Sequence, residues 1–346
     1  MIKYLGSKRL LLPRLVSALT AGGARSALDL FSGTSRVGHA LKRQGLRVHA
    51  NDHNAYAHTL ARCYVAADAR RWRAPAERLL AELDALPGEA GWFTDTYCVR
   101  SRYLKPENGA RVEAIRSRIA ALALEPELEA IALTSLVEAA DRVDSTVGVQ
   151  MAYLKQWAAR AHQPLRLRLP ELVDGEGSAS CLDAFEAAGR FEADVAYLDP
   201  PYNQHSYLGN YHVWETLVRW DAPEVYGIAC KRTDVRERGS AFNRRTSFVE
   251  AFTAVLACVR ARRIVVSFND EGFLALPQLR ELLARRGEVS ELSVDHPRYI
   301  GHRLGVYNLK GVKVGTPGPA RNREHLFVVE CEGARPAARR LRTALA

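Results

Sequence analysis

The sequence lacks the cysteine and histidine patterns that build metal centres or disulfide frameworks. Its six cysteines stand apart, and neither a Cys-x-x-Cys pair nor histidines clustered at metal-ligand spacing are present. We therefore expect reduced, mostly small buried cysteines and no metal. Long hydrophobic runs are also missing, because no segment approaches the roughly 18 apolar residues of a membrane span. The first residues, Met-Ile-Lys-Tyr, do not form the apolar core of a signal peptide. These absences predict a cytoplasmic protein without a membrane partner.

Acidic residues are fewer than basic residues in this sequence. The chain has 49 Lys and Arg residues against 39 Asp and Glu residues, which gives a net charge of +10. This excess favours a polyanionic partner such as nucleic acid, although basic proteins without such a partner are common. With 346 residues, 47% of them hydrophobic, the chain is long enough for a full core and a second domain.

The order of apolar runs predicts an α/β fold, a doubly wound and mainly parallel sheet with a helical insert. Residues 1–65 and 166–332 alternate β-rich runs with helical stretches, as such a sheet requires. Residues 66–165 are helical in pattern and rich in Ala, Leu, Arg and Glu, and residues 333–346 form a basic tail. Turn-rich loops are expected at 172–180 and 231–245. Buried strands are expected at residues 26–31, 47–51, 193–198, 263–268 and 325–330.

A glycine turn follows the first expected strand. Asp29 lies in that strand, Gly33 lies in the turn, and a helix follows, so backbone N–H groups are available to a closely approaching ligand. Asp52 ends the next strand, close to the spacing of about 20 residues at which an acid binds a ribose hydroxyl. A turn that merely packs a helix on a sheet is the alternative. The dinucleotide pattern Gly-x-Gly-x-x-Gly is absent, so a nucleoside cofactor without phosphates fits best.

A second site follows the strand at 193–198, where Asp199, Pro200, Pro201 and Tyr202 come at the expected carboxyl edge of the sheet. An exocyclic amino group on a base is a poor nucleophile, and acceptors for both N–H bonds favour its pyramidal form. Asp199 and the Pro200 carbonyl can supply these acceptors, and the prolines fix the loop. Tyr202 offers an aromatic face to a flipped base. A merely proline-stiffened loop is the alternative.

These motifs, in this order, resemble the Dam-type DNA adenine methylases. The resemblance implies a methyl transfer from S-adenosylmethionine to adenine N6 in double-stranded DNA after base flipping, in a nucleoid-associated protein that a restriction endonuclease can accompany. The matching segments are Lys3-Tyr4-Leu5-Gly6-Ser7-Lys8, Phe31 and Gly33, Asp52, and Cys181-Leu182-Asp183. For Tyr4, Gly6, Lys8, Phe31, Gly33, Asp52 and Asp183 the resemblance implies contacts with the cofactor.

Other functions remain open at this stage. Methylation of cytosine N4 uses the same acceptors, whereas methylation of cytosine C5 is disfavoured because no cysteine follows a proline. An RNA or protein-glutamine methyltransferase is a further alternative, although those enzymes usually carry Asn at the position of Asp199. A non-catalytic DNA-binding protein on the same scaffold is a further alternative. The helical insert matches no relative residue by residue, so no recognition sequence follows from it.

Two basic groups are candidate DNA contacts, although a merely solvated surface is the alternative for both. The first lies in the loop at 231–245, and it could clamp phosphates near the flipped base. The second lies within the helical insert, interleaved with Tyr97 and Tyr103. The first group is Lys231, Arg232, Arg236, Arg238, Arg244 and Arg245, and the second is Arg100, Arg102, Lys105 and Arg111.

Overall fold

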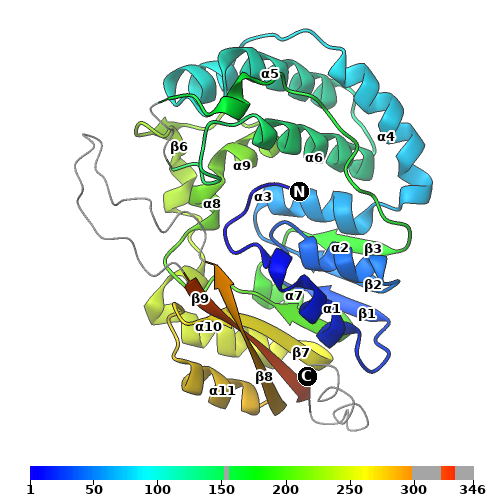
Figure 1. The fold of residues 1–346 in the computed structure, drawn as a ribbon, viewed down its shortest axis with the longest axis vertical. Coiled ribbons are helices and arrows are strands. Elements are labelled where there is room, and N and C mark those ends of the chain that lie inside the picture. The colour runs from blue at the N-terminus through cyan, green and yellow to red at the C-terminus, as the bar shows by residue number, and fades with distance from the viewer. Residues whose placement is uncertain (152–155, 298–320, 332–346) are drawn as a thin grey trace.

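A seven-stranded sheet organises the computed structural model, which describes residues 1–151, 156–297 and 321–331 (Figure 1). The strand order is β3-β2-β1-β4-β7-β9-β8. The first five strands in this order are parallel, and β9 is antiparallel to both of its neighbours. This sheet confirms the mainly parallel α/β fold. The strands are β1 (Ser26–Asp29), β2 (Arg47–Asn51), β3 (Gly177–Ser180), β4 (Glu192–Leu198), β7 (Arg260–Asn269), β8 (Gly287–Pro297) and β9 (Arg321–Cys331).

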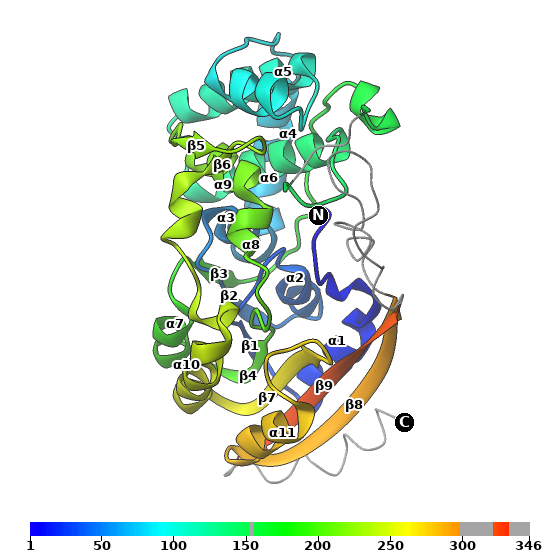
Figure 2. The same cartoon turned by 90° about the vertical axis from the view of Figure 1, so that its left-hand side faces the viewer.

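Helices cover both faces of the sheet because successive strand residues point to opposite sides. Val195 of β4 and Val265 of β7 belong to one core cluster, whereas their neighbours Ala196 and Ile264 belong to another. The first cluster packs under α1 (Leu12–Thr20) and α2 (Arg36–Arg43). The second packs under α7 (Ala184–Arg190), α10 (Arg245–Cys258) and α11 (Leu276–Ala284), which lie on the other side of the sheet in Figure 2.

The elements described between residues 66 and 165 are all helical, as the sequence predicts, and they lie beyond the β3 end of the sheet (Figure 1). Helices α3 and α9 flank α6 and share one continuous core with it, through Leu60, Leu136 and Leu217. The helices of this region are α3 (Ala55–Ala61), η2 (Arg62–Ala66), α4 (Ala69–Asp84), η3 (Thr94–Arg100), α5 (Pro106–Ala121), α6 (Pro126–Arg142), η4 (Ala159–His162), α8 (Tyr207–Asn210) and α9 (His212–Arg219).

Several elements differ from the expectation. Strand β3 lies within the expected loop at 172–180, where Gly177 allows close packing because a Cβ there would approach the Val65 carbonyl to 2.2 Å. Strand β8 and the ribbon of β5 (Val225–Tyr226) and β6 (Lys231–Arg232) were also not expected. Cys181 is exposed rather than buried. The tail at 333–346 lies outside the described residues, and none of the described helices is long and apolar enough to cross a membrane.

Candidate active site

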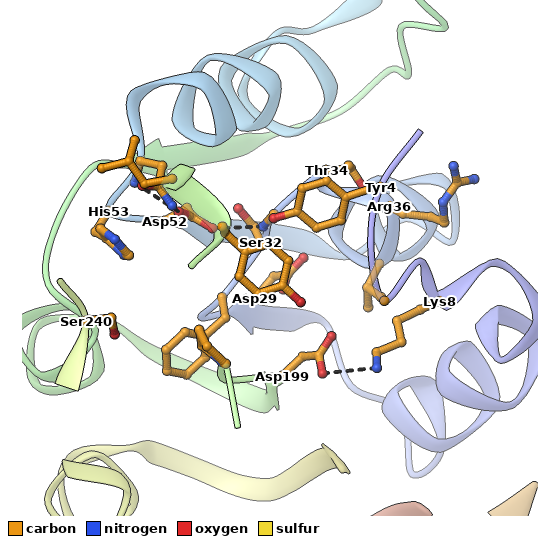
Figure 3. A pocket seen from close by; sticks show the side chains of 18 of the residues that line it. Tyr4, Lys8, Asp29, Ser32, Thr34, Arg36, Asp52, His53, Asp199 and Ser240 are labelled. Atoms are coloured by element: carbon orange, nitrogen blue, oxygen red, sulfur yellow. Dashed lines mark hydrogen bonds and ion pairs between the residues drawn. The ribbon is translucent and has the colours of Figure 1, made fainter. Parts of the chain in front are cut away.

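A cavity opens where β1, β2 and β4 end, at the carboxyl edge of the sheet (Figure 3). Parallel strands bring the loops that follow them to the same edge, so segments distant in sequence meet there. Of the residues predicted from the sequence, the cavity is lined by Tyr4, Gly6, Lys8, Asp29, Phe31, Gly33, Asp52, Asp199 and Pro201. The two predicted constellations therefore form one site.

Asp52 is fixed between the loops that follow β1 and β2. Its Oδ2 accepts a hydrogen bond of 3.0 Å from the Gly33 backbone N–H, and its Oδ1 accepts one of 2.9 Å from the Asn54 N–H. The backbone at Gly33 has φ +50°, and a Cβ there would lie 3.1 Å from the Tyr4 ring. Glycine is therefore required for both the turn and the close approach of Tyr4.

An aromatic stack forms one wall of the cavity. The Tyr4 ring lies parallel to the rings of Tyr207 and Tyr211, with centroids 5.2 and 4.7 Å away. The hydroxyl groups of Tyr4 and Tyr56 are 3.2 Å apart. Tyr207 also lines the cavity. The sequence analysis did not single out Tyr207, although its position five residues after Tyr202 is a usable signal.

Buried polar atoms without partners gather beside this wall. In the described part of the chain, ten buried side-chain N or O atoms lack a hydrogen-bond partner, and five of them belong to residues 29–54. Buried polar groups normally find partners, so such a concentration indicates a ligand site. These five atoms are Asp29 Oδ1, Ser32 Oγ, Ser35 Oγ, Arg36 Nε and Asn54 Oδ1.

Asp29 is one of these residues. Its Oδ2 accepts a hydrogen bond of 2.9 Å from the Gly38 N–H. Burial raises the pKa of Asp29 to about 7, although that hydrogen bond lowers it, because a desolvated carboxylate is less stable than the neutral acid. A cationic ligand beside Asp29 would restore the charged form.

Lys8 pairs with Asp199, the first residue of the Asp-Pro-Pro-Tyr motif. Lys8 Nζ lies 3.1 Å from Asp199 Oδ1 and 3.2 Å from Glu324 Oε2. Burial raises the pKa of Asp199 to about 6, and the Lys8 ammonium opposes that rise. Burial alone would lower the pKa of Lys8, but the nearby carboxylates outweigh it and hold this pKa well above its usual range. Lys8, for which the resemblance implies a cofactor contact, thus pairs with Asp199 of the Asp-Pro-Pro-Tyr motif.

Sequence reasoning missed Glu324. It lies near the start of β9, and because β9 is antiparallel to β7, this start meets the carboxyl end of β7 beside the site. The segment was expected as a strand, but its direction was not. An acidic residue at the start of a hydrophobic strand was the available signal.

Tyr202 and Pro200 do not line the cavity. The Tyr202 side chain is buried and packs on Phe268, with ring centroids 4.8 Å apart. The loop that follows is held by Asn243, whose Nδ2 donates hydrogen bonds to the carbonyl oxygens of Asn203 and His205 at 2.9 and 3.0 Å. The ring predicted to stack on a base is therefore covered in the ligand-free protein.

Asp183 is also not part of the cavity lining. It is exposed and caps α7, because its Oδ1 accepts a hydrogen bond of 2.8 Å from the Phe185 N–H. The contact with cofactor adenine that the resemblance implies therefore stays a prediction. A helix cap accounts for this residue without any ligand.

The first basic group divides into buried and exposed members. The prediction of a phosphate contact is wrong for Arg232, because its side chain is buried and makes ion pairs of 2.7 and 2.9 Å with Asp221 and Asp234. Lys231 is half-buried, and burial lowers its pKa. Arg244 and Arg245 are exposed where α10 begins. Arg236 is also exposed, with its guanidinium 4.0 Å from the centre of the Tyr226 ring, so three members of the group have the expected exposure.

Arg238 lines the cavity rather than facing solvent alone. Its Nη1 lies 2.9 Å from Glu215 Oε1, and Glu215 is fully buried. The other carboxylate oxygen of Glu215 accepts a hydrogen bond of 3.1 Å from the Tyr56 N–H. Glu215 therefore links the basic loop to the segment that carries Asp52.

Fewer residues of the second basic group are placed to contact DNA than the sequence suggests. Tyr97 and Tyr103 are buried in the helical core, so their rings are not free to stack on bases. Arg111 is held by Asp84 at 3.0 Å. Arg102 lies over the Trp157 ring, at 4.9 Å. Arg100 is exposed and stays a candidate contact.

Comparison with known proteins agrees with this geometry. Residues 4–271 match the family model of the D12 class N6 adenine-specific DNA methyltransferases. The chain is 30% identical over 314 residues to the Type II methyltransferase M.NlaIII of Neisseria lactamica, covering 86% of this chain and 92% of that protein. It is 28% identical to the modification methylase StsI of Streptococcus sanguinis and to M.FokI of Planomicrobium okeanokoites, of which it spans 47% each. The chain thus belongs to the D12 class of N6 adenine-specific DNA methyltransferases.

Proposed function

We propose that the protein methylates adenine N6 in duplex DNA, with S-adenosylmethionine as the methyl donor. In this proposal Asp52 binds the ribose of the donor, and Asp199 binds the amino group of the adenine that accepts the methyl group. One observation carries this proposal: both carboxylates line a single cavity, which four residues with a partnerless buried polar atom also line. Because β1 lies between β2 and β4, the glycine turn after β1 separates a nucleoside site at Asp52 from an acceptor site at Asp199.

The residues present fit this donor. Asp52 would accept hydrogen bonds from the ribose hydroxyls, and the aromatic wall at Tyr4 would cover the cofactor. Asp29 Oδ1, which has no partner, would face the cationic part of the methionine. The bound donor supplies a methyl group activated on a sulfonium centre. The glycine turn lacks the Gly-x-Gly-x-x-Gly pattern that binds a pyrophosphate, and this donor has no phosphate groups.

The acceptor end must bind and activate the adenine amino group. Asp199 would accept a hydrogen bond from one N–H of the amino group, and the Pro200 carbonyl would accept one from the other N–H. The nitrogen lone pair would then point toward the methyl group. The N–C bond would form as the bond between the methyl group and the sulfonium breaks, which leaves a neutral thioether; the nitrogen would become positive, and Asp199 would take up its departing proton. Lys8 and Glu324 would hold Asp199 in place through the chain of ion pairs described above. Alignment of this kind is worth about 7 to 11 kcal/mol.

Tyr202 would support the flipped base. Base extrusion costs a few kcal/mol, and stacking on an aromatic side chain returns about 1 to 3 kcal/mol. Because the Tyr202 ring is buried against Phe268 in this structure, it must first be uncovered before a base can stack on it. Exposed Arg244 and Arg245 would contact phosphates of the duplex. A restriction endonuclease is the proposed functional partner, by analogy with Type II relatives.

The test is single-turnover transfer of a labelled methyl group from S-adenosylmethionine to duplex DNA. Asp199→Ala should reduce the rate on the order of a thousandfold, because the variant lacks an acceptor that acts chiefly in the transition state, while cofactor and DNA affinities stay within about a few-fold. Tyr202→Phe should retain much of the activity, because the ring remains. A near-normal rate for Asp199→Ala would refute the assignment.

A further inference from the structure

The cavity contains a cation that the described residues leave unpaired. Three Lys or Arg side chains line it: Lys8, Arg36 and Arg238. Lys8 is paired with Asp199 and Glu324, and Arg238 is paired with Glu215 and Asp234. The Arg36 side chain has neither an ion pair nor a hydrogen bond with any described residue, and its buried Nε lacks a partner.

Electrostatics make this arrangement costly. Burial lowers the pKa of Arg36 and the nearby charge of Arg9 lowers it further, whereas Tyr64 and Glu138 raise it by smaller amounts. A guanidinium nevertheless stays protonated in proteins, so the cost is borne as an unpaired, partly desolvated positive charge. An anionic group on a ligand would remove that cost. Carboxylate and phosphate groups match the planar fork of arginine.

The position of Arg36 selects between these anions. Arg36 is the first residue of α2, directly after the glycine turn, and Ser32 in that turn lines the cavity with a buried, partnerless Oγ. Figure 3 shows three sides of the cavity: Asp52 with His53, Asp199, and a third side with Thr34 and Arg36. The sulfonium of the donor carries three substituents. With the adenosyl group held by its ribose at Asp52 and the methyl group toward Asp199, the third substituent, or arm, would extend along this third side. That arm is an amino acid.

We propose that Arg36 binds the α-carboxylate of the methionine moiety of S-adenosylmethionine. This inference rests on the proposed function, because it assumes the donor and its orientation. The buried Ser32 hydroxyl adds a donor in the same turn. Lys8 is not available for this role, because it is engaged by two carboxylates.

Calorimetry with two ligands tests the proposal. The ligands are S-adenosylmethionine and its decarboxylated form, which keeps the nucleoside, the sulfonium and the amine but lacks the carboxylate. Arg36→Gln should weaken binding of S-adenosylmethionine about tenfold to a hundredfold and leave the affinity for the decarboxylated form within about threefold. The ratio of the two affinities should therefore collapse in the variant. Arg36→Lys should give an intermediate ratio, because it keeps the charge without the fork.

Arg43→Gln is the matched control. Arg43 lies on the same helix and is exposed and paired with Glu171, so this variant should keep the wild-type ratio. Equal weakening of both ligands in a folded Arg36→Gln protein, or weakening of neither, would overturn the proposal. Unchanged cofactor binding with weaker, less salt-dependent DNA binding would instead assign Arg36 to a phosphate. Failure of the wild-type protein to bind S-adenosylmethionine would contradict the proposed function itself.

Discussion

Buried Asp29 and half-buried Asp199, at the ends of neighbouring strands, have raised pKa values, and the structure gives them different surroundings. Asp199 ends β4 against the ammonium of Lys8, whereas Asp29 ends β1 with one oxygen bonded to backbone and the other without a partner. Burial is the main cause of the raised pKa in both. Only Asp199 has a cation that keeps it ionised near neutral pH without a ligand.

Activity should follow the ionisation of Asp199. Only the ionised carboxylate can both accept the hydrogen bond from the amino group and take up its proton. We therefore expect kcat/KM to be level above about pH 7 and to fall about tenfold per pH unit below a midpoint near 6. Lys8→Met should move this midpoint to higher pH, because the ammonium now lowers the pKa of Asp199. A profile that stays level down to about pH 5 would contradict the role of Asp199.

Asp29 should lower the stability of the ligand-free protein. Its pKa is about 7 in the folded state and near 3.8 in the unfolded state, so between these values the folded state binds more protons. Stability therefore falls as pH rises from about 4 to about 7, and the fall is complete above about pH 7. Asp29→Asn removes this charge and keeps an acceptor for the Gly38 N–H, so at about pH 8 it should raise Tm by at least about 2 °C.

The pH dependence is the control for this prediction. The stabilisation by Asp29→Asn should shrink when Tm is measured at about pH 5. Calorimetry at about pH 8 should show weaker binding of S-adenosylmethionine by the same variant. A lower Tm for Asp29→Asn than for wild type at that alkaline pH would contradict this account of Asp29.

At the scale of elements, the sequence predicted the parallel centre of the sheet better than its edges. Strands β1, β4 and β7 contribute residues to the core clusters on both faces of the sheet, so their sequences contain apolar runs followed by the polar residues of the site. Edge strand β3 has the sequence Gly-Ser-Ala-Ser and gives no such signal. The antiparallel direction of β9, which brings Glu324 to Lys8, depends on tertiary pairing that local pattern does not encode.

The same limit explains the basic loop. Charge density in the sequence made six residues of this loop candidate DNA contacts. It cannot distinguish Arg232, whose partners Asp221 and Asp234 lie close in sequence, from an exposed arginine. Likewise, Tyr97 and Tyr103 alternate with basic residues but face the helical core. Ion pairing and burial decide which charges remain for a partner.

Replacing Arg244 and Arg245 with Ala should weaken binding to all duplex sequences and lower the slope of log affinity against log salt by roughly one for each phosphate interaction removed. The matched control is Arg260→Ala with Arg262→Ala, two exposed arginines at the amino end of β7, the opposite edge from the site. That double variant should keep the wild-type slope. An unchanged slope for Arg244 and Arg245 would place the phosphate contacts elsewhere, with exposed Arg100 the next candidate.

At the scale of the whole molecule, the helical region and the sheet are joined by a shared core. Leu136 of α6 packs in the same cluster as Leu60 of α3, which directly follows the Asp52 segment, and Leu217 of α9, which follows the Asp-Pro-Pro-Tyr loop. Contacts made by the helices with DNA could thus act on both ends of the cavity through packed elements.

Identification of the methylated nucleoside tests the central claim most directly. Duplex DNA is incubated with the purified protein and S-adenosylmethionine, digested to nucleosides and separated by chromatography with mass detection, with Asp199→Ala as the matched control. The account predicts N6-methyladenine as the main product and none above background with Asp199→Ala. N4-methylcytosine as the sole product, or an equal yield of N6-methyladenine from Asp199→Ala, would contradict it.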